Sequence, residues 1–539
     1  MRLPGSPCGG ALRRRGSSSG RRDVIVVGGG HNGLVAAFYL ARAGLRTLVL
    51  ERRPIVGGAC VTEEFAPGFR ASPGAYVLSN LRPAIWRDMR LRERGLRVSP
   101  AGPSLNLFAD GRSFVLHNTD AETVREIAAF SAADARAFPA FKQEMADIGG
   151  LLLPTIDHAP GPLRAGLRAA RRRRAAERAV ELLATSARRY LDARFESEHV
   201  KAALGWDAIS NTLAGPSEAG TALALVHEHA ADPSGAVPWG FVAGGMGEVT
   251  RMLADAAREE GAEIRPGAEV ERILVDGGRA RGVELAGGGA EQARVVVSNA
   301  DPKRTFLRLC EPGQLPAGFA RAIRAYRCEG ASLKINLALS GLPAVAGSAA
   351  PNGAHRGLIQ VTLPLAEMDR HQQDARRGIP AIDPHLEVCF PTVHDPSLAP
   401  EGRHVATVGA RSQPYRLAGG SWDELRDPVA DRVVEQLGHH FPDLPGMVID
   451  REVLSPLDLE RRLALTGGHH LHGDMLPDQL FLLRPVRGAA GYRSPVRGLY
   501  LCGAGTHPGG GVTGANGRNC ARVVVRDLRR PRVRGSAGA

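Results

Sequence analysis

A glycine-rich turn near the start of the chain is the feature that most constrains its fold. Residues 23–27, DVIVV, are apolar enough for a buried strand, and GGGHNG follows them at once. Gly28, Gly30 and Gly33 have the GxGxxG spacing. The first glycine permits a tight turn, the second lets the backbone approach a pyrophosphate, and the third lets a helix pack against the strand. The motif predicts a βαβ unit that binds a dinucleotide.

The residues after the turn complete this unit. A helix is expected to begin near Asn32 and to direct its free N–H groups at the phosphates. The second strand follows at residues 45–51, LRTLVLE, and ends on Glu51, 23 residues after the first glycine. A carboxylate at this place can accept hydrogen bonds from an adenosine ribose. Strand, helix and acid thus all support dinucleotide binding.

The stretch ERRPIVGGAC at residues 51–60 extends the motif. It resembles the extended signature of FAD oxidoreductases, in which Gly57 and Gly58 lie along the cofactor. The resemblance implies that Arg52 and Ala59 also contact FAD. The alternative is an arginine-flanked glycine turn without a function.

No second GxGxxG follows a predicted strand. The nearest approach, at residues 244–247, lacks both the spacing and a preceding β run, and we expect it to begin a helix that packs on the nucleotide fold. A dedicated NAD(P)H site is therefore not predicted. Electrons must leave by another route, for which oxygen, a quinone and a redox protein are the candidates.

The stretch GLYLCGAGTHPGGGVTG at residues 498–514 carries the most specific resemblance in the chain. It is similar to the closing motif of the phytoene desaturase-like flavoenzymes, which are carotenoid and retinoid oxidoreductases. The resemblance covers residues 23–530 and implies FAD contacts at Gly503, Val512 and Thr513. It also makes His507 the ionisable candidate beside the flavin, unless that side chain only bonds backbone in the glycine-rich turn.

A middle segment, from residue 242 to residue 301, is similar to the FAD-contacting middle piece of the same family. The resemblance implies that Val270 touches the adenine through its backbone. The predicted fold is therefore α/β: a Rossmann-like FAD-binding domain of the amine oxidase and phytoene desaturase type, with an inserted mixed α+β substrate domain. The predicted pieces are a basic N-terminal extension (1–22), a first FAD-binding segment (23–105), a helical substrate or cap region (106–235), a second FAD-binding segment (236–308), the substrate domain (309–494), a third FAD-binding segment (495–530) and a basic tail (531–539).

The formal net charge of +13 is concentrated at the two ends of the chain. Residues 1–22 hold six arginines and no acid, and residues 526–534 add a net +4, so that the two ends supply 10 of the 13 charges. No aromatic-rich binding module accompanies them, and nucleic-acid binding is not predicted. Residues 1–22 also lack the apolar stretch of about 7 to 15 residues that a secretory signal has. They suit a mitochondrial transit peptide, hence the matrix, or a disordered extension on a cytoplasmic bacterial protein.

The cysteines and histidines do not have the spacing of redox or metal sites. The seven cysteines are Cys8, Cys60, Cys310, Cys328, Cys389, Cys502 and Cys520. They form no CxxC pair, and a redox disulfide at Cys60 would need a second cysteine a few residues on, so that chemistry is rejected. His469, His470 and His472 lack the i, i+4 spacing of helical metal ligands, and no metal is predicted.

The best functional hypothesis is an enzyme that moves a hydride from a C–H bond of an apolar or amphipathic substrate to flavin N5. Such a step needs no nucleophile or metal, so no catalytic residue is named. An amine oxidase shares the fold, and a flavin-fold protein with a mainly regulatory role in mitochondria is the non-enzymatic alternative. The arginine run 171–174 is expected to be a solvated helix face, with peripheral contact to anionic lipid as the alternative.

Overall fold

The computed structural model describes residues 21–161, 171–210, 212–230, 240–330, 332–346 and 353–529. Most of the predicted N-terminal extension, with Cys8, and the whole predicted tail at 531–539 lie outside these residues.

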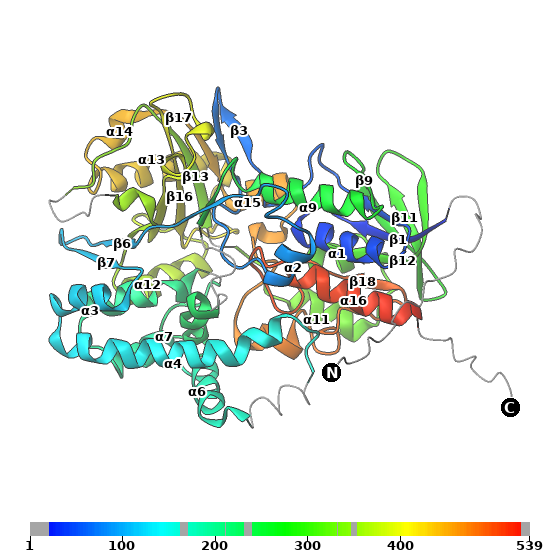
Figure 1. Cartoon of the computed structure of the whole chain (residues 1–539), viewed down its shortest axis with the longest axis horizontal. Helices are drawn as coiled ribbons and strands as arrows, with labels where there is room; N and C mark the ends of the chain where they lie inside the picture. The colour runs from blue at the N-terminus through cyan, green and yellow to red at the C-terminus, as the bar shows by residue number, and fades with distance from the viewer. Residues whose placement is uncertain are drawn as a thin grey trace, which may run out of the picture.

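Three separated segments of the chain build one parallel sheet (Figure 1). Its strands, in spatial order, are β18 (Leu499–Leu501), β12 (Ala290–Ser298), β1 (Arg22–Val27), β2 (Thr47–Leu50) and β9 (Glu263–Arg265). The first half of β12 also pairs antiparallel with a hairpin formed by β11 (Arg279–Leu285) and β10 (Val270–Asp276). Segments from the beginning, middle and end of the chain therefore meet in one sheet.

Helices cover both faces of this sheet, which explains why its strands are continuous apolar runs. One face carries α1 (His31–Arg42), α9 (Gly247–Glu259) and α16 (Ala515–Arg529), with α1 in contact with the other two. Val24, Val26 and Val297 point into this layer. Ile25 and Leu48 point to the opposite face, where they join the core formed with α10 (Pro302–Leu307) and α11 (Ala317–Ala325).

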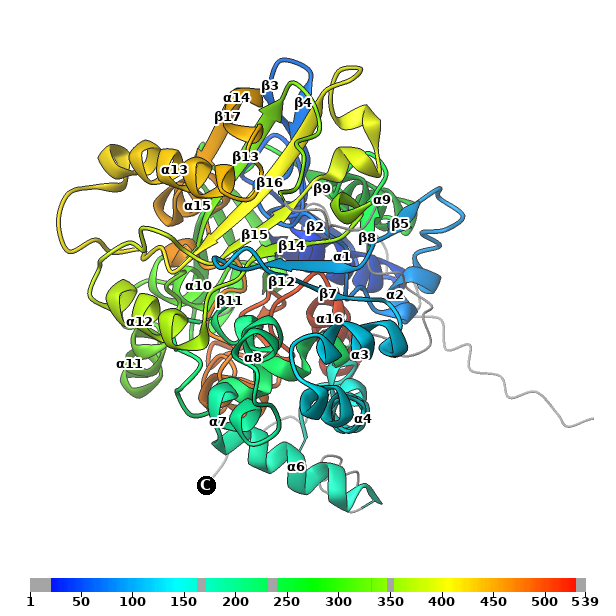
Figure 2. The same ribbon diagram turned by 90° about the vertical axis from the view of Figure 1, so that its left-hand side faces the viewer.

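A second, seven-stranded sheet forms a separate layer (Figure 2). Its strands, in spatial order, are β17 (Val448–Leu454), β13 (Ser332–Leu339), β16 (His404–Arg411), β15 (Leu386–Cys389), β14 (Ile359–Val361), β6 (Ser104–Leu107) and β7 (Ser113–Leu116). Neighbouring strands are antiparallel except β14 and β6. Leu333, Ile335 and Leu337 alternate with polar residues and pack under α13 (Trp422–Gly438) and α14 (Leu444–Met447).

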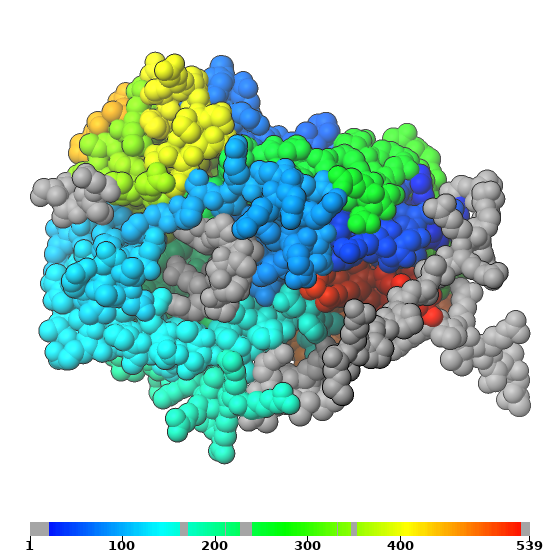
Figure 3. Space-filling view, viewed as in Figure 1, coloured from blue at the N-terminus to red at the C-terminus, as the bar shows by residue number. Residues whose placement is uncertain are grey.

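A helical region lies beside the second sheet and is the cyan region of Figure 3. Its helices are α3 (Asp120–Ala128), α4 (Ala132–Ile156), α6 (Arg173–Ala184), α7 (Ala187–Asp192) and α8 (Glu198–Gly205), joined by α12 (Leu365–Arg376). Phe138, Phe141 and Tyr190 form the centre of its core. The helical region is predicted to begin at residue 106, but β6 and β7 pair in the second sheet, and the first helix begins at Asp120.

Short elements connect these layers. They are β3 (Glu63–Ala66), β4 (Phe69–Ala71), α2 (Pro83–Asp88), β5 (Val98–Pro100), β8 (Gly240–Val242) and α15 (Pro456–Leu463). The expectation that no β run precedes the glycines at 244–247 is wrong, because β8 lies there and pairs with β5. Those glycines do lead into α9 as expected. Among the described helices, none is both long and apolar enough to cross a membrane.

Candidate functional site

The glycine turn between β1 and α1 leaves no room for side chains. Gly28 has a φ of +95°, and its N–H donates to the carbonyl of Leu50 at 2.8 Å. A Cβ on Gly33 would lie 2.2 Å from the Gly28 carbonyl oxygen, so a glycine there is what lets α1 approach β1. A Cβ on Gly30 would lie 2.8 Å from Nδ2 of Asn299, at the end of β12. The second glycine is therefore confined by a protein side chain as well as by any ligand.

Glu51 is buried at the end of β2 and organises this turn. Its Oε2 accepts the Gly29 N–H at 2.7 Å, and its Oε1 accepts the Arg53 N–H at 2.9 Å. The Glu51 carbonyl accepts the N–H of Ala268 at 2.8 Å. Val270 begins β10 two residues later, so the structure brings it to the same end of the sheet as Glu51.

The glycines at 57 and 58 pack directly on the turn. The Gly57 N–H donates to the Gly29 carbonyl at 2.9 Å, and Gly58, with a φ of +60°, lies so close that its Cβ would be 3.3 Å from the Gly30 Cα. Ala59 follows and accepts the Ala75 N–H at 2.8 Å. These two glycines and Gly28–Gly30 form the structure that we call the glycine cradle.

Arg52 points toward α15. Its guanidinium donates to the carbonyl oxygens of Arg461, at 3.2 Å, and Arg462, in the last turn of that helix. This side chain connects the glycine cradle with α15, and its predicted contact with the cofactor stays a prediction.

One asparagine holds the closing glycine-rich segment in place. Asn516, at the start of α16, donates through Nδ2 to the carbonyl oxygens of Gly503, Thr506, His507 and Gly509 at 3.0 to 3.3 Å. Thr513 Oγ1 accepts the Ala515 N–H at 3.2 Å. Sequence reasoning missed Asn516. The sequence signal that could have identified it is an amide side chain in the first turn of a helix that follows a glycine run.

Gly503 and Val512 flank this segment. A Cβ on Gly503 would lie 2.5 Å from the Asn299 carbonyl oxygen, so the closing segment presses against the end of β12. Val512 is half-buried and packs against the core that contains α1. The three contacts predicted in this segment, Gly503, Val512 and Thr513, therefore lie in the same layer as α1, the helix of the first glycine motif.

His507 is buried between the closing segment and α4. Its Nε2 donates to the Thr155 carbonyl at 2.9 Å, and its own carbonyl accepts the Tyr492 hydroxyl at 2.8 Å. Within the described residues, Nδ1 has no hydrogen-bond partner. Burial lowers the pKa of His507, so the ring is neutral and Nδ1 is an unused acceptor. A backbone-bonding role is thus observed, while the flavin-facing role stays a prediction.

Three further histidines, His31, His470 and His472, have lowered pKa values. Burial lowers the pKa of His31 to about 4, of His472 to about 4 and of His470 to about 3. By accessible surface, however, His31 and His472 are half-buried and His470 is exposed. The described residues contain no group of three or more side chains that could hold a metal ion.

The first turn of α1 offers buried polar atoms that a bound ligand could satisfy. Among the described residues, the buried atoms Nε2 of His31 and Oδ1 of Asn32 have no hydrogen-bond partner, and both lie in the first turn of α1. Buried polar atoms without partners are costly, and a polar ligand would satisfy them. The N-terminus of α1 also favours phosphate, since His31–Arg42 has no acidic residue in its first turn.

The polar face of the second sheet points toward the glycine cradle. Lys334 donates through Nζ to the Gly74 carbonyl at 2.6 Å and lies 5.0 Å from the centre of the Tyr76 ring. A Cβ on Gly74 would lie 2.3 Å from the Ala59 carbonyl oxygen, so only one segment separates Lys334 from the cradle. Burial lowers the pKa of Lys334 to about 8. Sequence reasoning missed this lysine, although SLKINLAL shows the alternation of a half-polar strand.

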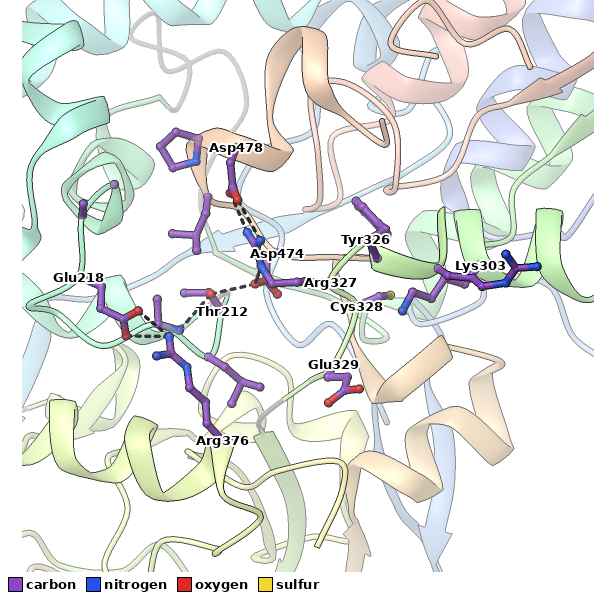
Figure 4. Close-up of a pocket in the computed structure, with 18 of the residues that line it drawn as sticks. Thr212, Glu218, Lys303, Tyr326, Arg327, Cys328, Glu329, Arg376, Asp474 and Asp478 are labelled. Carbon is purple, nitrogen blue, oxygen red and sulfur yellow. Dashed lines mark hydrogen bonds and ion pairs between the residues drawn. The ribbon is translucent and has the colours of Figure 1, made fainter. Parts of the chain in front are cut away.

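A separate pocket of about 770 Å³ opens at one end of the second sheet (Figure 4). Several of its charged side chains pair with one another. Arg327 contacts Asp474 at 2.9 Å and Asp478 at 2.7 Å, and Arg376 contacts Glu218 at 2.7 Å. Five cations and four acids line the pocket, so its charges are largely but not fully balanced.

The cysteines do not form a redox pair in the described structure. The six described cysteines are free and buried. Burial raises the pKa of Cys60 to about 12 and raises the pKa of Cys502 as well. Thiols with raised pKa values are poor nucleophiles and poor redox groups.

The comparisons with known proteins agree with this site. The family model described as flavin containing amine oxidoreductase matches residues 33–525. The chain is 38% identical over 536 residues to pyridine nucleotide-disulfide oxidoreductase domain-containing protein 2 of Rattus norvegicus, covering 93% of this chain and 92% of that protein. It is 28% identical over 513 residues to phytoene desaturase (lycopene-forming) of Pseudescherichia vulneris, covering 92% of this chain and 97% of that protein.

A solved structure has the same fold. Putrescine oxidase bound to putrescine superimposes with a TM-score of 0.61 at 16% identity, covering 94% of this chain and 99% of that one. The predicted α/β fold and the predicted relation to the phytoene desaturase-like enzymes are confirmed. The chain belongs to the flavin-containing amine oxidoreductase family and is a flavin-dependent oxidoreductase.

Proposed function

We propose that the cofactor is FAD and that the enzyme oxidises an amphipathic substrate by hydride transfer. The observation that carries the proposal is the glycine cradle, Gly28–Gly30 with Gly57 and Gly58, which brings backbone without side chains beside the N-terminus of α1 and the carboxylate of Glu51. A bound FAD supplies a hydride acceptor at flavin N5.

The chain's own residues have the following roles in this proposal. The N–H groups at the start of α1, with Asn32, hold the pyrophosphate. Glu51 accepts hydrogen bonds from the adenosine ribose, and the backbone at Val270 contacts the adenine. Val512 and Thr513 hold the other end of the cofactor, while the buried His507 and the polar sheet face enclose the reacting region and keep bulk water out.

An amphipathic substrate suits the structure better than a wholly apolar one or an amine. The sheet face toward the cradle carries Lys334 and Arg411, which a hydrocarbon would leave unsolvated. The same two cations repel an ammonium group. The electron acceptor is proposed to be oxygen, a quinone or a redox protein, because no second nucleotide fingerprint follows a strand in the sequence.

Two further features of the proposal concern location. The arginines of 171–174 are exposed, and contact with an anionic membrane through them is proposed as the way an amphipathic substrate reaches the enzyme. Import into the mitochondrial matrix is proposed for residues 1–22, which lie almost wholly outside the described residues; fusing them to a fluorescent protein would test it.

The cofactor is tested by purifying the protein, releasing the bound group with acid and identifying it by chromatography. FAD is the expected result, and nicotinamide nucleotide or no bound group would contradict the proposal. Anaerobic titration with a lipid extract then tests the reaction, since an oxidisable substrate bleaches the oxidised flavin band. A flavin that is retained but that no extract reduces would favour the non-enzymatic alternative.

A further inference from the structure

The inner face of the second sheet carries charged side chains that are closed off from solvent. Residues of β13 alternate between the apolar core under α13 and this inner face, where Lys334 and Asn336 lie. Arg411 ends the neighbouring strand β16, and Glu387 lies on β15 next to it. Buried charges are costly unless they are fully paired, so a partly paired cluster calls for an explanation.

The pairing of Arg411 is incomplete. Its side chain is 10% exposed, and its Nη2 lies 3.5 Å from Oε1 of Glu387, beyond the 2.7–2.9 Å typical of charge-assisted bonds. Its Nη1 donates to Ser332 Oγ at 3.3 Å. Within the described residues, its Nε has no hydrogen-bond partner. A guanidinium normally binds a carboxylate through two parallel bonds, and Arg411 lacks such a partner here.

The local charge balance is positive. Arg411 and Lys334 are both cations, and Glu387 is the acid in contact with Arg411. Glu452 also acts on Lys334, but it is bound by the guanidinium of Arg462. One positive charge is therefore left without a matching acid among the described residues of this cluster, which suits a singly charged anion better than a doubly charged phosphate.

The cluster lies close to the segment that follows the glycine cradle. Lys334 is bonded to Gly74, which packs on Ala59 of the segment that follows the glycine cradle. Burial lowers the pKa of His470, whose side chain is nevertheless exposed, and the charges of Arg411 and Lys334 lower this pKa further. Lys334 and the neighbouring Arg411 therefore lie on the face of the second sheet that points toward the cradle.

We propose that Arg411, with Lys334 beside it, binds a carboxylate of the substrate, so that the enzyme acts on an amphipathic carboxylic acid. The inference rests on the proposed function, because it assigns the substrate class of the same site. The acid group would supply the two hydrogen bonds that Arg411 lacks, and the apolar end of the molecule would extend toward the flavin.

The test uses sodium decanoate as the probe, with decan-1-ol and decylamine as matched compounds of the same chain length. Binding to the purified flavin-loaded protein is measured by calorimetry and by the difference spectrum of the bound flavin. Decanoate is expected to bind at least tenfold more tightly than either compound. The variants Arg411→Gln and Lys334→Met should each weaken decanoate binding by about tenfold or more and leave decanol binding unchanged, because charge-assisted bonds are lost.

Arg403→Gln is the control, since Arg403 is exposed and donates to the Ser340 carbonyl outside this cluster. Equal binding of decanoate and decanol, unchanged decanoate binding by folded Arg411→Gln, or a preference for decylamine would each overturn the proposal. Circular dichroism checks folding, and if Arg411→Gln fails it, Lys334→Met alone decides. Failure of the proposed function is seen separately, as a wild-type protein that carries no FAD.

Discussion

Gly33→Ala adds one methyl group at the tightest contact between α1 and β1. The new Cβ would lie 2.2 Å from the Gly28 carbonyl oxygen, whereas ordinary contact begins at 3.4 Å, so helix and strand must separate by about 1 Å. The carbonyl cannot turn away easily, because Gly28 has a φ of +95° and its N–H is bonded to Leu50. The contact is with backbone, and no change of rotamer relieves it.

Overpacking of this kind costs about 1–3 kcal/mol, and a backbone clash belongs at the upper end. For a domain of roughly 150–250 residues, about 3 kcal/mol lowers Tm by about 6–12 °C. The same shift moves the N-terminus of α1 away from the phosphates. We therefore expect Gly33→Ala to lose most of its flavin, and the loss of ligand lowers Tm further.

The assay is the ratio of flavin to protein absorbance after purification, together with thermal melts with and without added FAD. Gly318→Ala is the matched control, since Gly318 lies in the first turn of α11 and no described atom lies within 4 Å of its added Cβ. That variant should stay yellow and be unchanged or slightly more stable, because alanine favours the helix by about 1 kcal/mol. A Gly33→Ala protein as yellow and as stable as Gly318→Ala would refute the reasoning.

Four further predictions follow from named contacts. Gly517→Ala should destabilise the α1–α16 contact, because its Cβ would lie 2.0 Å from the Asn32 carbonyl; urea unfolding measures this, and a stability equal to wild type would contradict it. Replacing all seven cysteines should leave flavin reduction largely intact if the protein folds, whereas a thiolate-to-flavin charge-transfer band in wild type with lost turnover in the variant would restore disulfide chemistry. Burial lowers the pKa of Lys334 to about 8, whereas the same side chain has a pKa of 10.5 in the unfolded chain. Between these two pH values the unfolded chain binds more protons than the folded one, so the free energy of unfolding rises with pH. Relative to Lys334→Met, wild type should gain about 2 kcal/mol between pH 8 and 10 in denaturant titrations, and parallel pH profiles would disprove this. Arg484→Met should lower the free energy of unfolding, measured in urea, by more than about 3 kcal/mol, since this fully buried side chain donates to five carbonyl groups. A loss under about 1 kcal/mol would show that the backbone that supplies these carbonyl groups keeps its structure without Arg484.

The sequence alone determined the features that depend on neighbouring residues. The glycine spacing, the first βαβ unit and the acid at Glu51 were predictable because a tight turn and a helix start are set by a few adjacent residues. The helix at α9, expected after the glycines at 244–247, was found in the same way. The resemblance of the closing segment supplied the family, which local patterns could not.

Only the tertiary structure decided which distant residues meet. Asn299 confines Gly30, and Asn516 gathers four carbonyl groups, through contacts that no sequence spacing encodes. Arg411 meets Ser332 because β13 and β16 pair in one register, and a shift of one residue would turn these side chains to the opposite face. The polar face of the second sheet, and with it the proposed substrate site, exists only once strands far apart in the sequence have paired.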